Sequence, residues 1–487
     1  MHQNSTLLEA ASSSLQYTGI SLQNPHPFSI EKSKCYAIIG ENGCGKTTLG
    51  KIIEKGWNIG TNVIHGDKKS LQIRNIEFSD IHSLTGCKDS YYQQRFEATQ
   101  NDAIPTVEEL IKGRIEPDLW NKLCDKLSLT EILHKRINFL SSGELRKFLI
   151  INLFSSVPDI LIIDNPYIGL DATSRELFNN LIKSIVSQDT AVILLLCNPI
   201  EIPDFCTHII PMKNREIGKM REVKDVDAER KWCTDLFPND FDTSKIPFNN
   251  NIPKNEFSTA FELRKCNVNY GATTILNEVS WKVQADEKWA LLGENGAGKS
   301  TLLSLVYADN PQGYRNDIIL FDHQRGTGES IWEIKRNISY ISPEMHLYFN
   351  NGEDVMTIVA SGFHDNVGCF RKITPENKEI AIQWLEALGI ANLADRRFNT
   401  LSAGEQRLAL LARTFIKGAP LLILDEPLHG LDMSKKKLIA KIIEKSTDNE
   451  NVALIYVTHY EHEIPSVVNH TFRLTKFRNT ALNNHVD

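Results

Sequence analysis

Two glycine-rich segments in this chain have the residue types and the spacing that bind phosphate groups. Both fit the pattern G-x-x-x-x-G-K-[ST], and they span Gly40–Thr47 and Gly293–Ser300. An apolar run precedes each segment and a helical pattern follows it, which is the context that a nucleotide-binding loop requires. The glycines let backbone N–H groups curve around phosphates, and the helix N-terminus adds positive potential. Two matches in the correct context predict two phosphate sites, because chance glycine-rich turns do not explain both.

The polar residues of these loops have separate predicted roles. The amino groups of Lys46 and Lys299 are predicted to reach the β- and γ-phosphates of ATP, and the hydroxyls of Thr47 and Ser300 to hold Mg²⁺. The full set of predicted nucleotide contacts comprises Gly40, Asn42, Gly43, Gly45, Lys46, Thr47 and Thr48 in the first loop and Gly293, Asn295, Gly296, Gly298, Lys299, Ser300 and Thr301 in the second.

Two aspartates provide further ligands for a metal ion. Asp164 and Asp425 each follow four apolar residues that favour a buried strand. Such a strand exposes its terminal carboxylate beside the phosphate loop, where it is predicted to coordinate Mg²⁺ directly or through water. The alternative is that each aspartate only caps a following helix.

The same landmarks occur twice along the chain, in the same order. Three pairs share one offset of 261 residues, namely Ser141 with Ser402, Asp164 with Asp425, and Asn198 with His459. The two loop lysines are 253 residues apart, so the second copy carries about eight extra residues in its middle. A duplicated domain explains this register.

The elements that must position these residues are those of an α/β fold. Short apolar runs bounded by turn residues predict strands buried on both faces of a mostly parallel sheet, with helices between them. In the chain of 487 residues, we assign the first domain to 1–223 and the second to 259–487. The intervening segment 224–258 lacks sustained periodicity and is interpreted as an exposed linker.

Together, these motifs resemble those of the ATP-binding-cassette (ABC) ATPases over nearly the whole chain. The family's signature loop, L-S-G-G-Q in its usual form, is matched by Leu140–Glu144 and Leu401–Glu405, and its D-loop Leu-Asp pair is matched at residues 170–171 and 431–432. The resemblance implies two tandem P-loop NTPase domains of the ABC type. Each would have a mostly parallel core sheet, an antiparallel β subdomain and a helical subdomain.

The resemblance also implies a head-to-tail pair of cassettes with two ATP molecules between them. Each site would combine the phosphate loop of one cassette with the signature of the other. The signature residues that would contact ATP are Ser141, Gly143, Glu144, Ser402, Gly404 and Glu405. Fusion in one chain supplies both cassettes at high effective concentration.

The two sites differ in their catalytic residues. In this family an acidic residue after the strand aspartate polarises the attacking water, and a switch histidine follows a later strand. The second cassette has Glu426 and His459, whereas the first has Asn165 and Asn198. A neutral amide cannot act as a base. We therefore predict one competent site, with Glu426, His459 and Lys299 as catalytic residues, and one degenerate site.

Two further features distinguish the cassettes from their relatives or from each other. Tyr270 stands where family members place a ring against adenine, although a surface or core tyrosine is the alternative; Tyr17 is the only nearby candidate in the first cassette. Family members also carry a glutamine after the central strand that links Mg²⁺ to a partner protein. The matching segments, 78–80 and 341–344, have none, which argues against coupling to a conventional permease.

Composition limits the partners of the chain. The formal net charge is −7, which argues against general binding to nucleic acid. The nine cysteines form no C-x-x-C pair, as expected of reduced thiols. The N-terminal segment does not resemble a signal peptide, and the longest apolar runs are too short to span a bilayer. We expect a cytoplasmic protein that reaches the inner face of a membrane only through a permease partner.

The segment Gly313–Lys335 is unusual for cassettes in general. It resembles a block in bacterial tandem-cassette proteins described as molybdate-transport-related or photorepair-type ATP-binding proteins, and it could equally be a β-hairpin unique to that subfamily. Two functions compete: the energising subunit of a transporter, and a soluble ATP-driven switch on a cytosolic partner such as a ribosome or repair complex. The absent glutamines disfavour the first, and the short, non-basic linker disfavours ribosome binding. Glu426 and His459 weaken a third reading, an inert nucleotide-bound scaffold.

Overall fold

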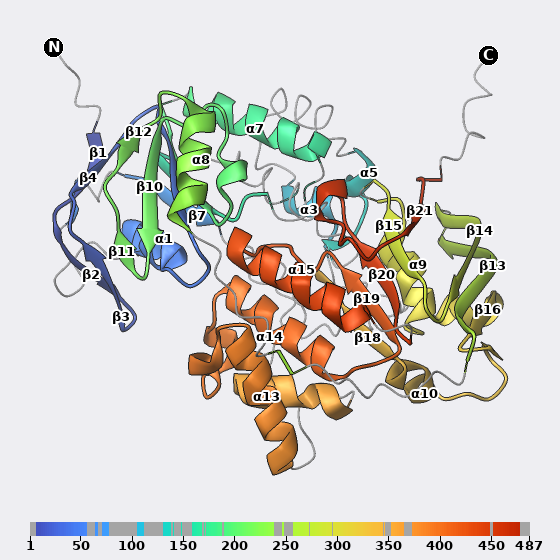
Figure 1. Cartoon of the computed structure of the whole chain (residues 1–487). Helices are drawn as coiled ribbons and strands as arrows, with labels where there is room; N and C mark the ends of the chain where they lie inside the picture. Colours follow the sequence, from blue (N-terminus) through green and yellow to red (C-terminus); the bar gives the residue numbers. More distant parts are fainter. Residues whose placement is uncertain are drawn as a thin grey trace, which may run out of the picture.

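The computed structural model has two α/β halves that lie side by side and contact each other (Figure 1). Figure 1 colours the first half blue to green and the second half yellow to red. The residues that the structure describes are 6–55, 64–66, 71–76, 105–111, 130–137, 140, 148, 158–167, 170, 172–187, 189–237, 246–247, 257–271, 273–294, 296–343, 345, 352–364, 373–448 and 451–477.

The first half is built on a sheet whose central strands are parallel. Its strands are β1 (Thr6–Ala10), β2 (Ser13–Tyr17), β3 (Ile20–Asn24), β4 (Phe28–Glu31), β5 (Cys35–Gly40), β6 (Ile64–His65), β7 (Ile73–Ile76), β8 (Ile160–Asp164), β9 (Ala191–Leu196), β10 (His208–Lys213), β11 (Glu216–Ile217) and β12 (Arg221–Glu222). Strands β10, β5, β9, β8 and β7 pair in parallel in that order. A separate antiparallel sheet has the order β4-β1-β6.

The second half repeats this plan with separate parallel and antiparallel sheets. Its strands are β13 (Thr259–Tyr270), β14 (Thr273–Gln284), β15 (Lys288–Leu292), β16 (Asp317–Leu320), β17 (His323–Gln324), β18 (Ile338–Ile341), β19 (Leu421–Asp425), β20 (Ala453–Val457) and β21 (His470–Arg473). The parallel sheet has the order β18-β19-β20-β15-β21, and the antiparallel sheet has the order β14-β13-β16-β17.

Helices connect the strands and cover the parallel sheets. Those of the first half are α1 (Lys46–Lys55), α3 (Val107–Ile111), α5 (Thr130–Leu133), α7 (Ala172–Val186) and α8 (Val226–Leu236). Those of the second half are α9 (Lys299–Val306), α10 (Ile331–Arg336), α12 (Val355–Ala360), α13 (Pro375–Ala387), α14 (Ala403–Ile416) and α15 (Met433–Thr447). Helices α12, α13 and α14 pack together as a helical subdomain, in which the Trp384 and Phe415 rings stack at 5.6 Å between centroids.

The strands that carry the motif residues are buried along their whole length. Every residue of β5, β8, β9, β19 and β20 is buried, because these strands lie inside parallel sheets that are covered on both faces. Continuous apolar sequence is what such strands require. The predicted α/β class with two P-loop domains, each with a mostly parallel core sheet, is confirmed by this architecture.

The segment 224–258 differs from the exposed linker that its sequence suggested. Its first part forms α8, which Asp225 caps by accepting hydrogen bonds from the backbone N–H groups of residues 227 and 228. Cys233 of this helix is fully buried in the core of the first half. The beginning of the segment is therefore part of the first folded unit. The division at 1–223, 224–258 and 259–487 otherwise stays a prediction.

The unusual segment Gly313–Lys335 is held by two buried cations. The Arg325 guanidinium donates to the carbonyl of Leu305 at 2.9 Å and lies over the Tyr314 ring, while Lys335 Nζ is 2.5 Å from Asp309 Oδ1. These contacts fix β16, β17 and α10 against the helix that follows the second loop. Among the described residues, no helix is long and apolar enough to cross a membrane.

Candidate functional site

The first glycine-rich loop joins the end of β5 to the start of α1. Gly43 and Gly45 have φ angles of +78° and +104°, which favour glycine. Lys46 is buried, and its Nζ donates to the carbonyls of Gly40 and Glu41 at 2.8 and 2.9 Å. The loop therefore curls around the lysine amino group, as a phosphate cradle does.

The second loop has the same geometry between β15 and α9. Gly296 and Gly298 have φ angles of +78° and +99°. Lys299 Nζ donates to the carbonyls of Gly293 and Glu294 at 2.8 and 3.1 Å. Ser300 and Thr301 continue into the first turn of α9. Asn295 lies outside the described residues.

Predicted metal-binding residues meet at the tip of β8. Thr47 Oγ1 donates to Asp164 Oδ2 at 2.5 Å, and the Asn165 amide donates to Asp164 Oδ1 at 2.9 Å. In the second half, Asp425 is buried at the equivalent end of β19. Hydroxyl and carboxylate oxygens are the ligands that Mg²⁺ prefers. The Thr47–Asp164 pair therefore fits the ion, and Asp425 provides a carboxylate at the equivalent place in the second half.

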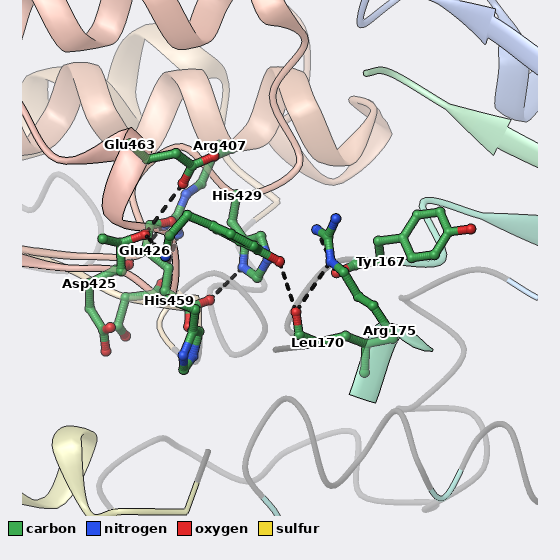
Figure 2. A network of polar contacts seen from close by, with 12 residues as sticks. Tyr167, Leu170, Arg175, Arg407, Asp425, Glu426, His429, His459 and Glu463 are labelled. Carbon is green, nitrogen blue, oxygen red and sulfur yellow. Dashed lines mark hydrogen bonds and ion pairs between the residues drawn. The ribbon is translucent and has the colours of Figure 1, made fainter. Parts of the chain in front are cut away.

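The carboxylate of Glu426 lies between two histidines (Figure 2). Its Oε1 is 2.7 Å from His459 Nε2, and its Oε2 is 2.6 Å from His429 Nδ1. Burial alone would raise the pKa of Glu426, but the two imidazoles outweigh it and hold that pKa well below its usual range. The group is therefore an ionised carboxylate in close contact with both imidazoles.

At the two equivalent positions that the structure describes, the first half has asparagines, Asn165 and Asn198, in place of Glu426 and His459. The Asn198 side chain accepts a hydrogen bond from the backbone N–H of Ile200 at 3.1 Å and caps a short 3₁₀ helix, Pro199–Glu201. The Asn165 amide is hydrogen-bonded to Asp164. Both asparagines therefore make local hydrogen bonds to their own half.

Asn165 and Glu426 nevertheless share one backbone conformation. Each has a φ of +48°, in the left-handed region that L residues rarely adopt. Each backbone N–H donates to the neighbouring parallel strand, at 3.0 Å to Leu195 and 2.9 Å to Val457. The two halves thus present different side chains from the same turn.

Sequence reasoning missed two residues that surround Glu426. His429 has Ile168 at its equivalent position in the first half, so comparison of the two copies gave no signal. Arg407 is buried in α14 and donates to the carbonyls of Ser342, Asp425 and Glu426 at 3.0, 3.1 and 2.7 Å. A buried arginine bonded to these backbone oxygens fixes the turn that carries the carboxylate.

The first loop contacts the second half directly. The Asn42 backbone N–H donates to Asp432 Oδ2 at 2.8 Å, and its side chain donates to the Gly430 carbonyl at 3.0 Å. A side chain added to Gly404 would collide with the Asn42 amide, so the signature of the second half lies against this loop. The arrangement is head-to-tail, with the first loop facing the second signature and second D-loop.

The second signature forms the start of α14. Ser402 caps this helix, and its backbone N–H donates to Glu405 Oε2 at 2.8 Å in a capping box. Tyr270 ends β13, and its hydroxyl accepts from the Asn310 amide at 3.2 Å while 36% of the residue stays exposed. The first signature residues Ser141, Gly143 and Glu144 lie outside the described residues, as do the segments 78–80 and Glu344.

The fold and the paired loops define a tandem ATP-binding-cassette ATPase. The family model described as ABC transporter matches residues 24–168 and 276–429, and the chain belongs to this family. It is 32% identical over 451 residues to the ABC transporter ATP-binding protein ModF of Escherichia coli (strain K12), covering 89% of this chain and 90% of that protein. An ABC transporter ATP-binding protein of Schizosaccharomyces pombe is 26% identical and covers 91% and 92% of the two chains.

Solved structures support the same architecture. The RNase-L Inhibitor aligns with a TM-score of 0.54 at 18% identity, covering 95% of this chain and 88% of that one. A chain of the structure titled "Model of ribosome-bound archaeal Pelota and ABCE1" aligns with a TM-score of 0.59 at 18% identity, covering 94% and 76%. At this identity the likeness shows the fold. Family membership establishes ATP binding and ATPase activity, and such domains generally bind ATP with Mg²⁺.

Proposed function

We propose that the two ATP sites are unequal. The second loop with the first signature hydrolyses ATP, and the first loop with the second signature binds ATP with little or no hydrolysis. The observation that carries this proposal is the Glu426–His459 contact of 2.7 Å, where the first cassette has two asparagines engaged in local hydrogen bonds. A carboxylate beside an imidazole can orient and deprotonate water, whereas two amides offer no base.

In the competent site each residue has one task. Lys299 neutralises the γ-phosphate, while Ser300 and Asp425 supply oxygens to Mg²⁺, which polarises the phosphate when bound. Glu426 orients the attacking water and accepts its proton, and His459 fixes that carboxylate. Contacts from the other cassette come from Ser141, Gly143 and Glu144, and Tyr270 stacks on adenine.

The first site has the parts for binding without those for turnover. Lys46 belongs to an intact phosphate-binding loop, and Thr47 and Asp164 supply the oxygens for Mg²⁺. ATP between this loop and Ser402, Gly404 and Glu405 touches both cassettes, so binding there stabilises the closed pair. The Asn42–Asp432 hydrogen bond across the same interface supports this role.

Photolabelling tests this asymmetry directly. The protein would be incubated with Mg²⁺ and an azido-ATP that carries label on the γ-phosphate or on the adenine, then cross-linked, digested and mapped. We expect adenine label on both cassettes but retained γ-phosphate label only on the first. Equal loss of γ-phosphate label from both cassettes would contradict the proposal.

For the cellular role, we propose that the pair energises transport through a separate membrane chain at the cytoplasmic face. The printed name of the Escherichia coli relative, an ABC transporter ATP-binding protein, supports this role. The competing role is an ATP-driven switch on a cytosolic partner such as a ribosome or repair complex. The absence of the coupling glutamine from both copies favours it.

Affinity purification distinguishes the two roles. The Glu426→Gln variant would be used with Mg-ATP because it should hold the cassettes closed around nucleotide, with Lys299→Ala as the control that cannot close. Co-purification of an integral membrane protein with the first variant alone supports transport. Co-purification of ribosomal or repair proteins in its place overturns it.

A further inference from the structure

A hydrogen bond joins the switch loop of the second cassette to the D-loop of the first. The Tyr460 hydroxyl donates to the carbonyl of Leu170 at 2.9 Å, although the residues are 290 positions apart. Burial raises the pKa of Tyr460, so the phenol stays protonated and remains a donor. Leu170 is itself buried, and its carbonyl is therefore a fixed acceptor.

Arg175 of the first cassette holds both partners of this bond. Its guanidinium lies 4.9 Å from the Tyr460 ring centroid and 5.2 Å from that of Tyr167, and its Nε donates to the same Leu170 carbonyl at 3.4 Å. Figure 2 shows Arg175 beside Leu170. An ion pair with Glu201 at 3.3 Å orients the arginine from its own cassette. Stacking on aromatic rings and donation to a carbonyl both depend on the planar guanidinium.

Tyr460 directly follows His459, the residue that contacts Glu426. Its backbone N–H donates to Thr458 Oγ1 at 3.1 Å, which fixes the loop on both sides of the histidine. Any displacement of the first D-loop therefore moves the tyrosine ring and, through one peptide unit, the imidazole that holds the catalytic carboxylate. A displacement of this kind is costly for catalysis, since rates depend steeply on alignment.

We propose that Tyr460 and Arg175 are positioning residues, through which the first cassette's D-loop sets His459 and Glu426 for hydrolysis in the second. This inference rests on the proposed assignment of the competent site to the second loop. Through this contact, turnover in the second site depends on how the first cassette docks against the second. ATP bound at the first site holds the two cassettes together.

The equivalent contact at the degenerate site is built differently. Pro199 stands at the position of Tyr460, offset by 261 residues, and it has neither a hydroxyl nor an N–H. There the second D-loop carbonyl, on Leu431, accepts a hydrogen bond from the Cys197 thiol at 3.6 Å. Lys436 replaces Arg175 at that offset and pairs with Glu463 at 2.8 Å. A weak thiol donor and a non-planar ammonium make a looser link, as expected where no carboxylate needs alignment.

The first test is Tyr460→Phe, which removes one hydroxyl and keeps the ring. We expect kcat to fall roughly threefold to tenfold, the loss of one hydrogen bond in the aligned state, with KM for ATP unchanged. The matched control is Tyr36→Phe, which removes a buried hydroxyl that accepts the Glu31 N–H within the first cassette. This control should lower thermal stability and leave kcat unchanged. Wild-type kcat in Tyr460→Phe overturns the inference.

A double-mutant cycle supplies the second test. Arg175→Met keeps the length of the side chain and loses both the stacking and the donor, whereas Arg175→Lys keeps the charge. We expect Arg175→Met to lower kcat, Arg175→Lys to rescue it in part, and the two losses with Tyr460→Phe to be clearly non-additive. Additive losses in the cycle overturn the coupling. Glu426→Gln, assayed in parallel, separates the two proposals. Retained turnover in Glu426→Gln refutes the site assignment. If Glu426→Gln loses turnover while Tyr460→Phe keeps the wild-type kcat, only the positioning role is refuted.

Discussion

The two cassettes place different side chains on one backbone. Asn165 and Glu426 occupy the same left-handed turn, with the same φ of +48° and equivalent hydrogen bonds to the adjacent strand. Around Glu426 the imidazoles of His459 and His429 contact the two carboxylate oxygens, whereas the Asn165 amide donates to its neighbour Asp164. The comparison teaches that the scaffold of a nucleotide site can be kept in full while its catalytic chemistry is absent.

The largest expected difference is between Glu426→Gln and Asn165→Gln. We expect Glu426→Gln to lower steady-state ATP hydrolysis by about 10²–10⁴, because the carboxylate at this position is lost. Asn165→Gln should change it little, since one amide replaces another. Both would be assayed in one preparation by phosphate release. Similar losses in the two variants would contradict the proposed asymmetry of the sites and would assign a catalytic role to the Asn165 amide.

The loop lysines should differ in how they reduce activity. Lys299→Ala should nearly abolish turnover because it removes the cation at the hydrolysed phosphate. Lys46→Ala should raise the ATP concentration needed for half-maximal rate by about tenfold or more, since hydrogen bonds to charged groups contribute about 1.5–3 kcal/mol. Saturating ATP should restore much of the Lys46→Ala rate. A kcat loss in Lys46→Ala as deep as that of Lys299→Ala would contradict a binding-only first site.

His429 tests whether both oxygens of Glu426 must be held. His429→Leu leaves Oε2 without its imidazole in a buried setting, and we expect kcat to fall roughly tenfold. His429→Gln retains a donor and should recover part of this loss. Full activity in His429→Leu would mean that His459 alone suffices. Circular dichroism melting of each variant would check that the fold is intact.

The smallest expected effect concerns Cys197. Its thiol donates a long hydrogen bond of 3.6 Å to Leu431, and such bonds are weak. We expect Cys197→Ala to change kcat by less than about twofold, well below the effect of Tyr460→Phe. Equal effects from the two would show that the D-loop contacts of the sites are equivalent.

Much of the fold was predictable from the sequence because its signals are local. The glycine-rich loops, β5, β15, β8 and β19 all combine apolar runs with turn residues, and the constant offset of 261 residues indicated the duplication. Buried parallel strands need continuous apolar sequence, so their pattern survives without an alignment. The difference between Glu426 and Asn165 was visible for the same reason.

The remaining features depend on contacts that no local pattern encodes. Helix α8 is polar on average, and the packing of Val226, Trp232, Cys233 and Leu236 against the first core is what distinguishes it from an exposed linker. His429 appears in one copy only, and Tyr460 meets Leu170 only after both cassettes have folded and docked. Pairings of this kind follow from tertiary structure, and sequence spacing does not predict them.

The shared left-handed turn also gives a direction to the history of the two sites. Asparagine tolerates positive φ far better than most residues, whereas a non-glycine residue held there costs about 1–3 kcal/mol. Exchange of a glutamate for an asparagine in this turn therefore relaxes the backbone, and the reverse exchange strains it. After a gene duplication, loss of the base is a downhill step in stability and its recovery an uphill one. Selection for a stable fold would then oppose the return of glutamate to the first copy. The asymmetry between the two sites would persist once the second copy alone hydrolyses ATP.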